Sequence, residues 1–136
     1  MGLTKKGLPE SVSLSLLVSA FGVVLITLYG IATKSLDFST FDILYFGRYV
    51  IWAFVQELAF RGFIQTRIQK ASTPIVAIAV TGVVFSLLHL LYGVQLVLFT
   101  LPAGLVWGFM MWKRPNIAGP ALSHIILGQF LLQFVL

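Results

Sequence analysis

The sequence contains no cysteine, and this absence removes several classes of function. Disulfide bonds, cysteine-ligated zinc, iron–sulfur clusters and thiol nucleophiles all need that residue. Charged residues are also scarce. They make up 10% of the 136 residues, whereas a soluble domain carries about 25%. With so few charges the chain cannot cover a water-exposed surface, so a soluble enzyme, a secreted disulfide scaffold and a disordered tail are excluded.

Apolar residues take the place of the missing charges. They account for 59% of the chain, and the mean hydropathy is +1.01. This composition is typical of a protein that crosses the bilayer several times and has lipid as its main partner. The length suits one domain, so residues 1–136 are expected to form a single all-α membrane domain.

The net charge of +5 comes from lysines and arginines that stand singly or in pairs beside apolar segments. Nucleic acid is therefore not an expected partner, because a phosphate-binding surface needs clustered cations. The positions of the cations indicate instead how the chain is oriented in the membrane. Most of them fall on one side of the membrane if the N-terminus is cytoplasmic, namely Lys5, Lys6, Arg67, Lys70, Lys113 and Arg114. The positive-inside rule then predicts a cytoplasmic N-terminus and a C-terminus on the opposite side.

About five segments are long and apolar enough to be candidate transmembrane helices. They cover residues 12–31, 43–68, 74–92, 96–112 and 117–136. The first is uncharged and longer than a signal peptide needs, so we expect a retained N-terminal anchor helix. The short connections that follow the second segment predict antiparallel neighbours and a helical core over residues 43–136.

Ionisable side chains inside these segments are candidates for function, because each is costly in hydrocarbon. Glu57 and Arg61 are four residues apart, so they share a helix face and can pair. Gln56 lies about 100° around the helix from Glu57, which lets both border one cavity. Both histidines of the chain, His89 and His124, also fall inside predicted spans.

Three interpretations of these groups stay open. Glu57, His89 and His124 come from three helices and suit a zinc ion or another divalent metal, or a site that activates water. A structural interpretation lets Glu57 and Arg61 neutralise each other while each histidine hydrogen bonds to a neighbouring helix. The third makes the ionisable groups part of a small transporter or proton relay.

Three short motifs follow one another in successive segments. They are Gln56-Glu57-Leu58-Ala59-Phe60-Arg61-Gly62, then Phe85-Ser86-Leu87-Leu88-His89, then the stretch from Asn116 to His124. They resemble the EExxxR-G, FxxxH and HxxxN/D motifs of the CPBP family, the intramembrane CAAX-protease and bacteriocin-processing proteins. The resemblance covers roughly residues 53–133. Between the motifs, Gly104 and Gly108 are spaced for close helix packing.

The resemblance implies an all-helical membrane core that holds a peptidase site for a peptide or a prenylated peptide. In that family, the first glutamate and the FxxxH histidine activate water. The second histidine and its Asn or Asp stabilise the oxyanion, and the second glutamate and the arginine support the site. The residues of this chain that match are Glu57, Arg61, Phe85, His89 and His124.

Two positions depart from the motifs, with Gln56 in place of the first glutamate and Gly128 in place of Asn or Asp. A carboxamide cannot take a proton from water, and general-base catalysis contributes about 10²–10⁴-fold. The loss of an oxyanion donor costs a further 10²–10³-fold or so. We therefore expect a catalytically impaired protein of this fold, acting as a binding or structural subunit beside other membrane proteins. The alternative is an active intramembrane metallo-endopeptidase in which Glu57, His89 or Gln129 compensates.

Overall fold

The computed structural model describes residues 2–3 and 5–136 and is almost entirely helical. The described residues contain no strand, which confirms the predicted all-α bundle. Its main helices are α1 (Leu8–Thr33), α2 (Ile43–Glu57), η2 (Leu58–Gln65), α3 (Thr66–Ala71), α4 (Pro74–Leu88), α5 (Val94–Lys113) and α6 (Ala118–Phe134). Two short 3₁₀ segments, η1 (Phe38–Thr40) and η3 (His89–Tyr92), lie in connections.

Four helical stretches in the described part of the chain are long and apolar enough to cross a membrane. They are Leu8–Thr33, Ile43–Ala71, Pro74–Tyr92 and Val94–Lys113. These correspond to the first four predicted segments. The fifth differs: α6 has 17 residues and would span only about 25 Å. It is packed against three other helices instead of standing at the edge of the bundle.

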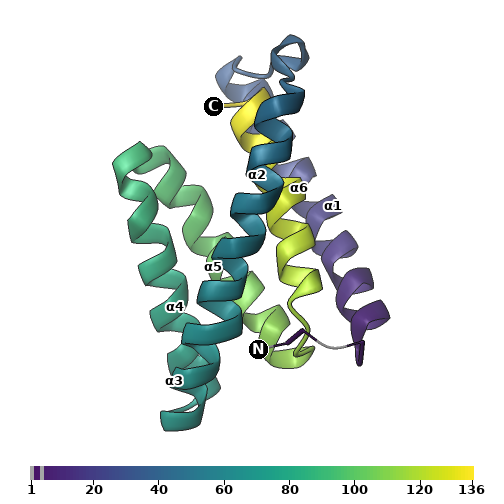
Figure 1. Ribbon diagram of the computed structural model, residues 1–136. Coiled ribbons are helices and arrows are strands. Elements are labelled where there is room, and N and C mark those ends of the chain that lie inside the picture. Colours follow the sequence, from purple (N-terminus) through teal and green to yellow (C-terminus); the bar gives the residue numbers. More distant parts are fainter. Residues whose placement is uncertain (1, 4) are drawn as a thin grey trace.

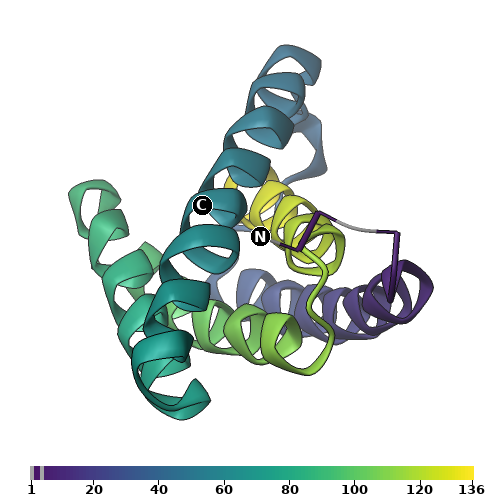
Figure 2. The ribbon, with the colours of Figure 1, turned by 60° about the horizontal axis from the view of Figure 1, so that its bottom comes forward.

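The helices form two groups (Figure 1). The first is an antiparallel hairpin of α4 and α5, joined by η3. The second contains α1, α2 and α6, with α6 packed against both of the others. In the tilted view of Figure 2, α6 lies beside α1, α2 and α5, and it contacts all three. Helix α1 begins and α6 ends at opposite ends of the bundle (Figure 1).

Helix boundaries follow from ordinary capping chemistry. The Asp42 carboxylate accepts hydrogen bonds from the backbone N–H of Leu44 and Tyr45 and so caps α2. Thr73 caps α4 in the same way, and Pro74 occupies its first turn, where a missing N–H costs nothing. Gly93 has a φ of 117°, a conformation that suits glycine, and there the chain turns from η3 into α5.

Small residues let the helices approach closely. A Cβ atom added to Gly104 on α5 would lie 3.3 Å from the backbone of Gly82 on α4. A Cβ atom on Gly108 would lie 3.1 Å from the Ile78 side chain. The close packing predicted from the Gly104–Gly108 spacing is confirmed.

Candidate active site

The centre of the site is a buried ion pair. Glu57 is the last residue of α2 and Arg61 lies one turn later in η2, and neither side chain is exposed. Arg61 Nη1 lies 3.2 Å from Glu57 Oε1, which confirms the predicted pairing. His124 Nδ1, from α6, lies 2.9 Å from the same oxygen. Since a carboxylate only accepts, the Nδ1–H of the histidine donates.

Arg61 also ties this cluster to the hairpin. Its Nη2 donates to the carbonyl oxygen of Gly104 at 3.0 Å. The guanidinium carbon lies 4.4 Å from the centre of the Phe85 ring and 5.5 Å from that of Trp107, so aromatic faces surround the cation. Glu57 Oε2 and Arg61 Nε are buried without a hydrogen-bond partner among the described residues.

The segment that carries Arg61 is a π-helix, η2, with wider turns than an α-helix. Such segments are rare and are frequently found at functional sites. Gln65, at its end, donates from Nε2 to the carbonyl oxygen of Gly108 at 2.8 Å. Sequence reasoning missed Gln65. The sequence did contain a signal for it. Gln65 follows Arg61 by four residues, and the same spacing separates Gly104 from Gly108, whose carbonyl oxygens accept the two hydrogen bonds.

His89 stands across the site at the start of η3 and is half-buried. Its Nδ1 lies 2.8 Å from the carbonyl oxygen of Phe85, so Nδ1–H is the donor there. The Phe85 ring lies one turn below His89, with ring centres 4.7 Å apart. The same ring contacts His124 edge-on at 5.5 Å and therefore lies against both histidines.

Trp107 holds the ring of His124 from the other side. The two rings stack with their centres 4.4 Å apart and an interplanar angle of 20°. Trp107 Nε1 donates to Ser123 Oγ at 3.0 Å, which fixes the indole in turn. Sequence reasoning missed this contact between Trp107 and His124.

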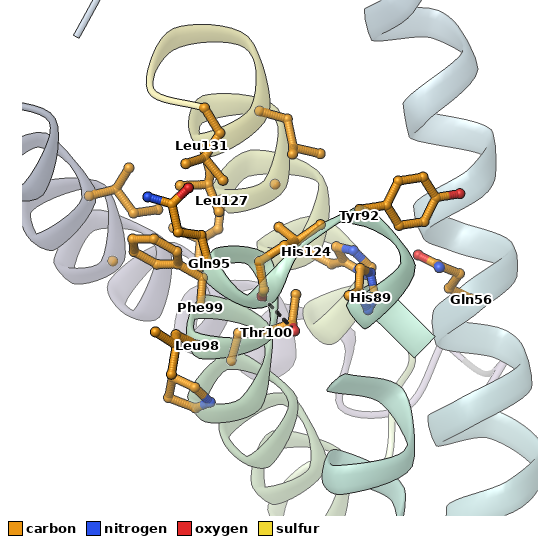
Figure 3. A pocket seen from close by; sticks show the side chains of 18 of the residues that line it. Gln56, His89, Tyr92, Gln95, Leu98, Phe99, Thr100, His124, Leu127 and Leu131 are labelled. Atoms are coloured by element: carbon orange, nitrogen blue, oxygen red, sulfur yellow. Dashed lines mark hydrogen bonds between the residues drawn. The ribbon is translucent and has the colours of Figure 1, made fainter. Parts of the chain in front are cut away.

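A cavity of about 1430 Å³ opens beside this cluster, lined from α1, α2, α4, η3, α5 and α6. Gln56, His89 and His124 line its polar side (Figure 3). Leu98, Phe99, Leu127 and Leu131 are among its apolar lining residues.

Glu57 is not among the described residues that line the cavity. Gln56 and Glu57 therefore do not border one cavity, and that expectation was wrong. The carboxylate of Glu57 is drawn inward by Arg61 and His124.

The described residues include no group of three His, Cys, Asp or Glu side chains placed to hold a metal ion. Glu57 and His124 are bonded to each other through His124 Nδ1. Glu57, His89 and His124, the predicted ligand set, do not form such a group in the described part of the chain.

A family model described as type II CAAX prenyl endopeptidase Rce1-like matches residues 38–128. The chain belongs to this family. The match confirms the resemblance that the three motifs suggested, and it includes every motif position from Gln56 to Gly128. The Rce1-like chain has no significant match among curated proteins or among solved structures.

Both departures of this Rce1-like protein from the family motifs lie on the cavity, since Gln56 and Gly128 each line it. Gln129, considered from sequence as a replacement donor, is used elsewhere. Its Nε2 donates to the carbonyl oxygen of Phe46 at 3.1 Å, and its Oε1 accepts from Gln133. The first bond connects α6 to α2, and the second lies within α6.

Proposed function

We propose that this Rce1-like membrane protein binds a prenylated CAAX peptide in its cavity and is catalytically impaired, acting as a binding subunit of a membrane complex. One observation carries the proposal. Of the adjacent pair Gln56 and Glu57, the carboxamide faces the cavity and the carboxylate faces Arg61 and His124.

Neither residue of the pair is suited to activate water. The carboxamide of Gln56 has no proton-accepting group near neutral pH. Glu57 is completely buried, and turning it into the cavity would leave the buried guanidinium of Arg61 without its counter-ion. Breaking such a pair costs about 3–5 kcal/mol. This leaves His89, whose Nε2 forms no hydrogen bond with the described residues, as the remaining candidate base, so wild-type cleavage is compared with that of a His89→Ala variant.

The cavity supports an apolar ligand with one polar end. Its volume of about 1430 Å³ exceeds the roughly 300–1,000 Å³ of ordinary small-molecule pockets. The apolar lining of α5 and α6 suits a prenyl chain, and the polar side with Gln56, His89 and His124 suits the adjoining peptide groups (Figure 3).

The test uses the purified protein in mild detergent with a fluorescent prenylated CAAX peptide. Saturable binding is expected, displaced by unlabelled prenylated peptide and not by the same peptide without the prenyl group. Cleavage followed by mass spectrometry is expected to match that of a His89→Ala variant. Gln56→Glu restores a general base and is expected to raise His89-dependent cleavage by about 10²-fold or more. Wild-type cleavage as fast as that of Gln56→Glu would establish the active peptidase instead.

The subunit role and the orientation have their own measurements. Native mass spectrometry of the extracted protein is expected to show a stoichiometric protein partner, and a chain found only alone would remove the subunit role. The absence of cysteine gives single-cysteine variants a clean background. With a cytoplasmic N-terminus, a membrane-impermeant thiol reagent added outside is expected to label Ser39→Cys and not Lys6→Cys. The reverse pattern would invert the topology.

A further inference from the structure

The side chain of Tyr49 fills the space beside Gly128. A Cβ atom added to Gly128 would lie 1.7 Å from Tyr49 Oη, 2.6 Å from Cζ and 3.0 Å from Cε1. Real Cβ atoms do not approach other atoms so closely, so the phenol already occupies the position that any side chain at residue 128 would take. The Tyr49 hydroxyl therefore lies where an Asn or Asp side chain at this motif position would begin.

The hydroxyl also lacks a hydrogen-bond partner in the described part of the chain, and its residue lines the cavity. Tyr49 lines the cavity together with Gln56, His89 and His124. No hydrogen bond joins Tyr49 Oη to the described residues, whereas a half-buried phenol ordinarily finds a partner. Its ring meets that of His124 edge-on, with centres 5.9 Å apart. On α2, Tyr49 lies seven residues, or about two turns, before Gln56, and so on the same helix face.

We propose that Tyr49 Oη–H donates a hydrogen bond to a carbonyl oxygen of the peptide bound beside His124. The inference rests on the proposed function, because it names the group that receives the peptide in that cavity. Three features that meet at one point support it. The Tyr49 hydroxyl occupies the side-chain position of residue 128, it has no hydrogen-bond partner among the described residues, and its ring lies beside the imidazole of His124. Gln129 is not available for this task, because its amide is bonded to Phe46 and Gln133.

Tyr49 and Gly128 then act as a pair. The phenol reaches this point only because residue 128 has no side chain, and a larger residue there would drive the ring away. The glycine at position 128 is accordingly needed to make room for Tyr49, and it does not mean that the hydrogen-bond donor at this position has been lost. The cavity keeps a carbonyl donor while it lacks a general base.

The test compares Tyr49→Phe with wild type, using a prenylated CAAX peptide carrying ¹³C at the carbonyl of the CAAX cleavage bond. Isotope-edited infrared spectroscopy is expected to show a lowered carbonyl stretching frequency in the wild-type complex, which returns to the unbonded value in Tyr49→Phe. The Kd is expected to rise about 2–13-fold, as for one net hydrogen bond.

Tyr45→Phe is the matched control. Tyr45 also lines the cavity and stacks on Tyr49 with ring centres 6.0 Å apart, but the three atoms nearest to a Cβ atom at Gly128 all belong to Tyr49. Its variant is expected to leave the carbonyl frequency unchanged, and thermal unfolding confirms that both variants are folded.

The outcomes separate the two proposals. Wild-type binding with a carbonyl frequency and Kd that Tyr49→Phe does not change would overturn the inference and leave the proposed function standing. Equal shifts from Tyr45→Phe would also overturn it, because the effect would then come from the aromatic stack. No binding by wild-type protein would overturn the proposed function and the inference together.

Discussion

The two faces of the rod formed by α2 and η2 differ in how tightly their polar residues are held. On the inward face, Glu57, Arg61 and Gln65 are completely buried and bonded to α5 or α6. On the cavity face, Tyr49 and Gln56 are half-buried and form no side-chain hydrogen bond with the described residues. Both departures from the family motifs, Gln56 and Gly128, line the cavity.

The comparison shows that a motif residue can be constrained by folding as well as by the chemistry of the site. A buried charge that loses its partner destabilises the whole bundle, so the inward residues are constrained by folding as well as by chemistry. A polar group that faces a cavity can change its chemistry at little structural cost. The fold and the cavity can therefore persist without hydrolysis.

The largest expected effect comes from breaking the inward face with Glu57→Gln. This change removes the counter-ion of buried Arg61 and is expected to lower the free energy of unfolding by about 3–5 kcal/mol. The matched control is Gln56→Ala, at the adjacent position on the cavity face, with an expected change within about 0.5 kcal/mol. Equilibrium unfolding in detergent measures both. Similar losses in the two variants would remove the distinction between the faces.

The contact between the inward face and the hairpin is tested by Gly104→Ala. The new methyl group would lie 3.2 Å from Arg61 Nη2 and 3.3 Å from the Gly82 backbone. Overpacking of this kind costs about 1–3 kcal/mol, measured by the same unfolding assay. Gly47→Ala, on the same rod as Arg61, has no atom within 4 Å of the new Cβ and is expected to be neutral or slightly stabilising. An equally neutral Gly104→Ala would contradict the close packing described above.

Trp107→Phe sharpens the comparison by loosening His124 while the Glu57–Arg61 ion pair stays in place. The variant keeps an aromatic ring against the imidazole but loses the hydrogen bond to Ser123 Oγ. The expected loss is about 0.5–1.5 kcal/mol of unfolding free energy. Trp112→Phe is the control, because its indole is more exposed and makes no hydrogen bond to the described residues. If the two substitutions cost the same, the bond to Ser123 contributes nothing.

The smallest effect is expected outside both faces, at Asp37 in the connection after α1. Hydrogen bonds from the Ser39 hydroxyl and backbone N–H lower the pKa of the exposed Asp37 carboxyl below its ordinary value. Because the folded pKa is lowered, the ionised carboxylate stabilises this turn at pH values above the ordinary carboxyl pKa. This stabilisation is lost as the pH falls through the folded pKa. An NMR titration of the Ser39 amide measures it, with Asp37→Ala as control. A midpoint at or above the ordinary value would contradict the prediction.

The sequence predicted the helices and the ion pair for a clear physical reason. Apolar length defines spans in a bilayer, and residues four apart on a helix meet, so the four long spans and the Glu57–Arg61 pair followed from spacing. Contacts between helices that are far apart in the sequence leave no such spacing pattern. Whether Gln56 or Glu57 faced the cavity depended on where His124 of α6 stood, and the contact between Tyr49 and Gly128 joins residues from α2 and α6.

The division of the bundle into a hairpin and a three-helix group has a mechanical consequence. Arg61 and Gln65 join α5 to η2 through the carbonyl oxygens of Gly104 and Gly108. His89 lies at the tip of the hairpin, at the start of η3, while Gln56 and His124 belong to the other group (Figure 1). The polar side of the cavity is therefore assembled from both groups, and the separation of His89 from the other two side chains is set by how the hairpin is held against η2.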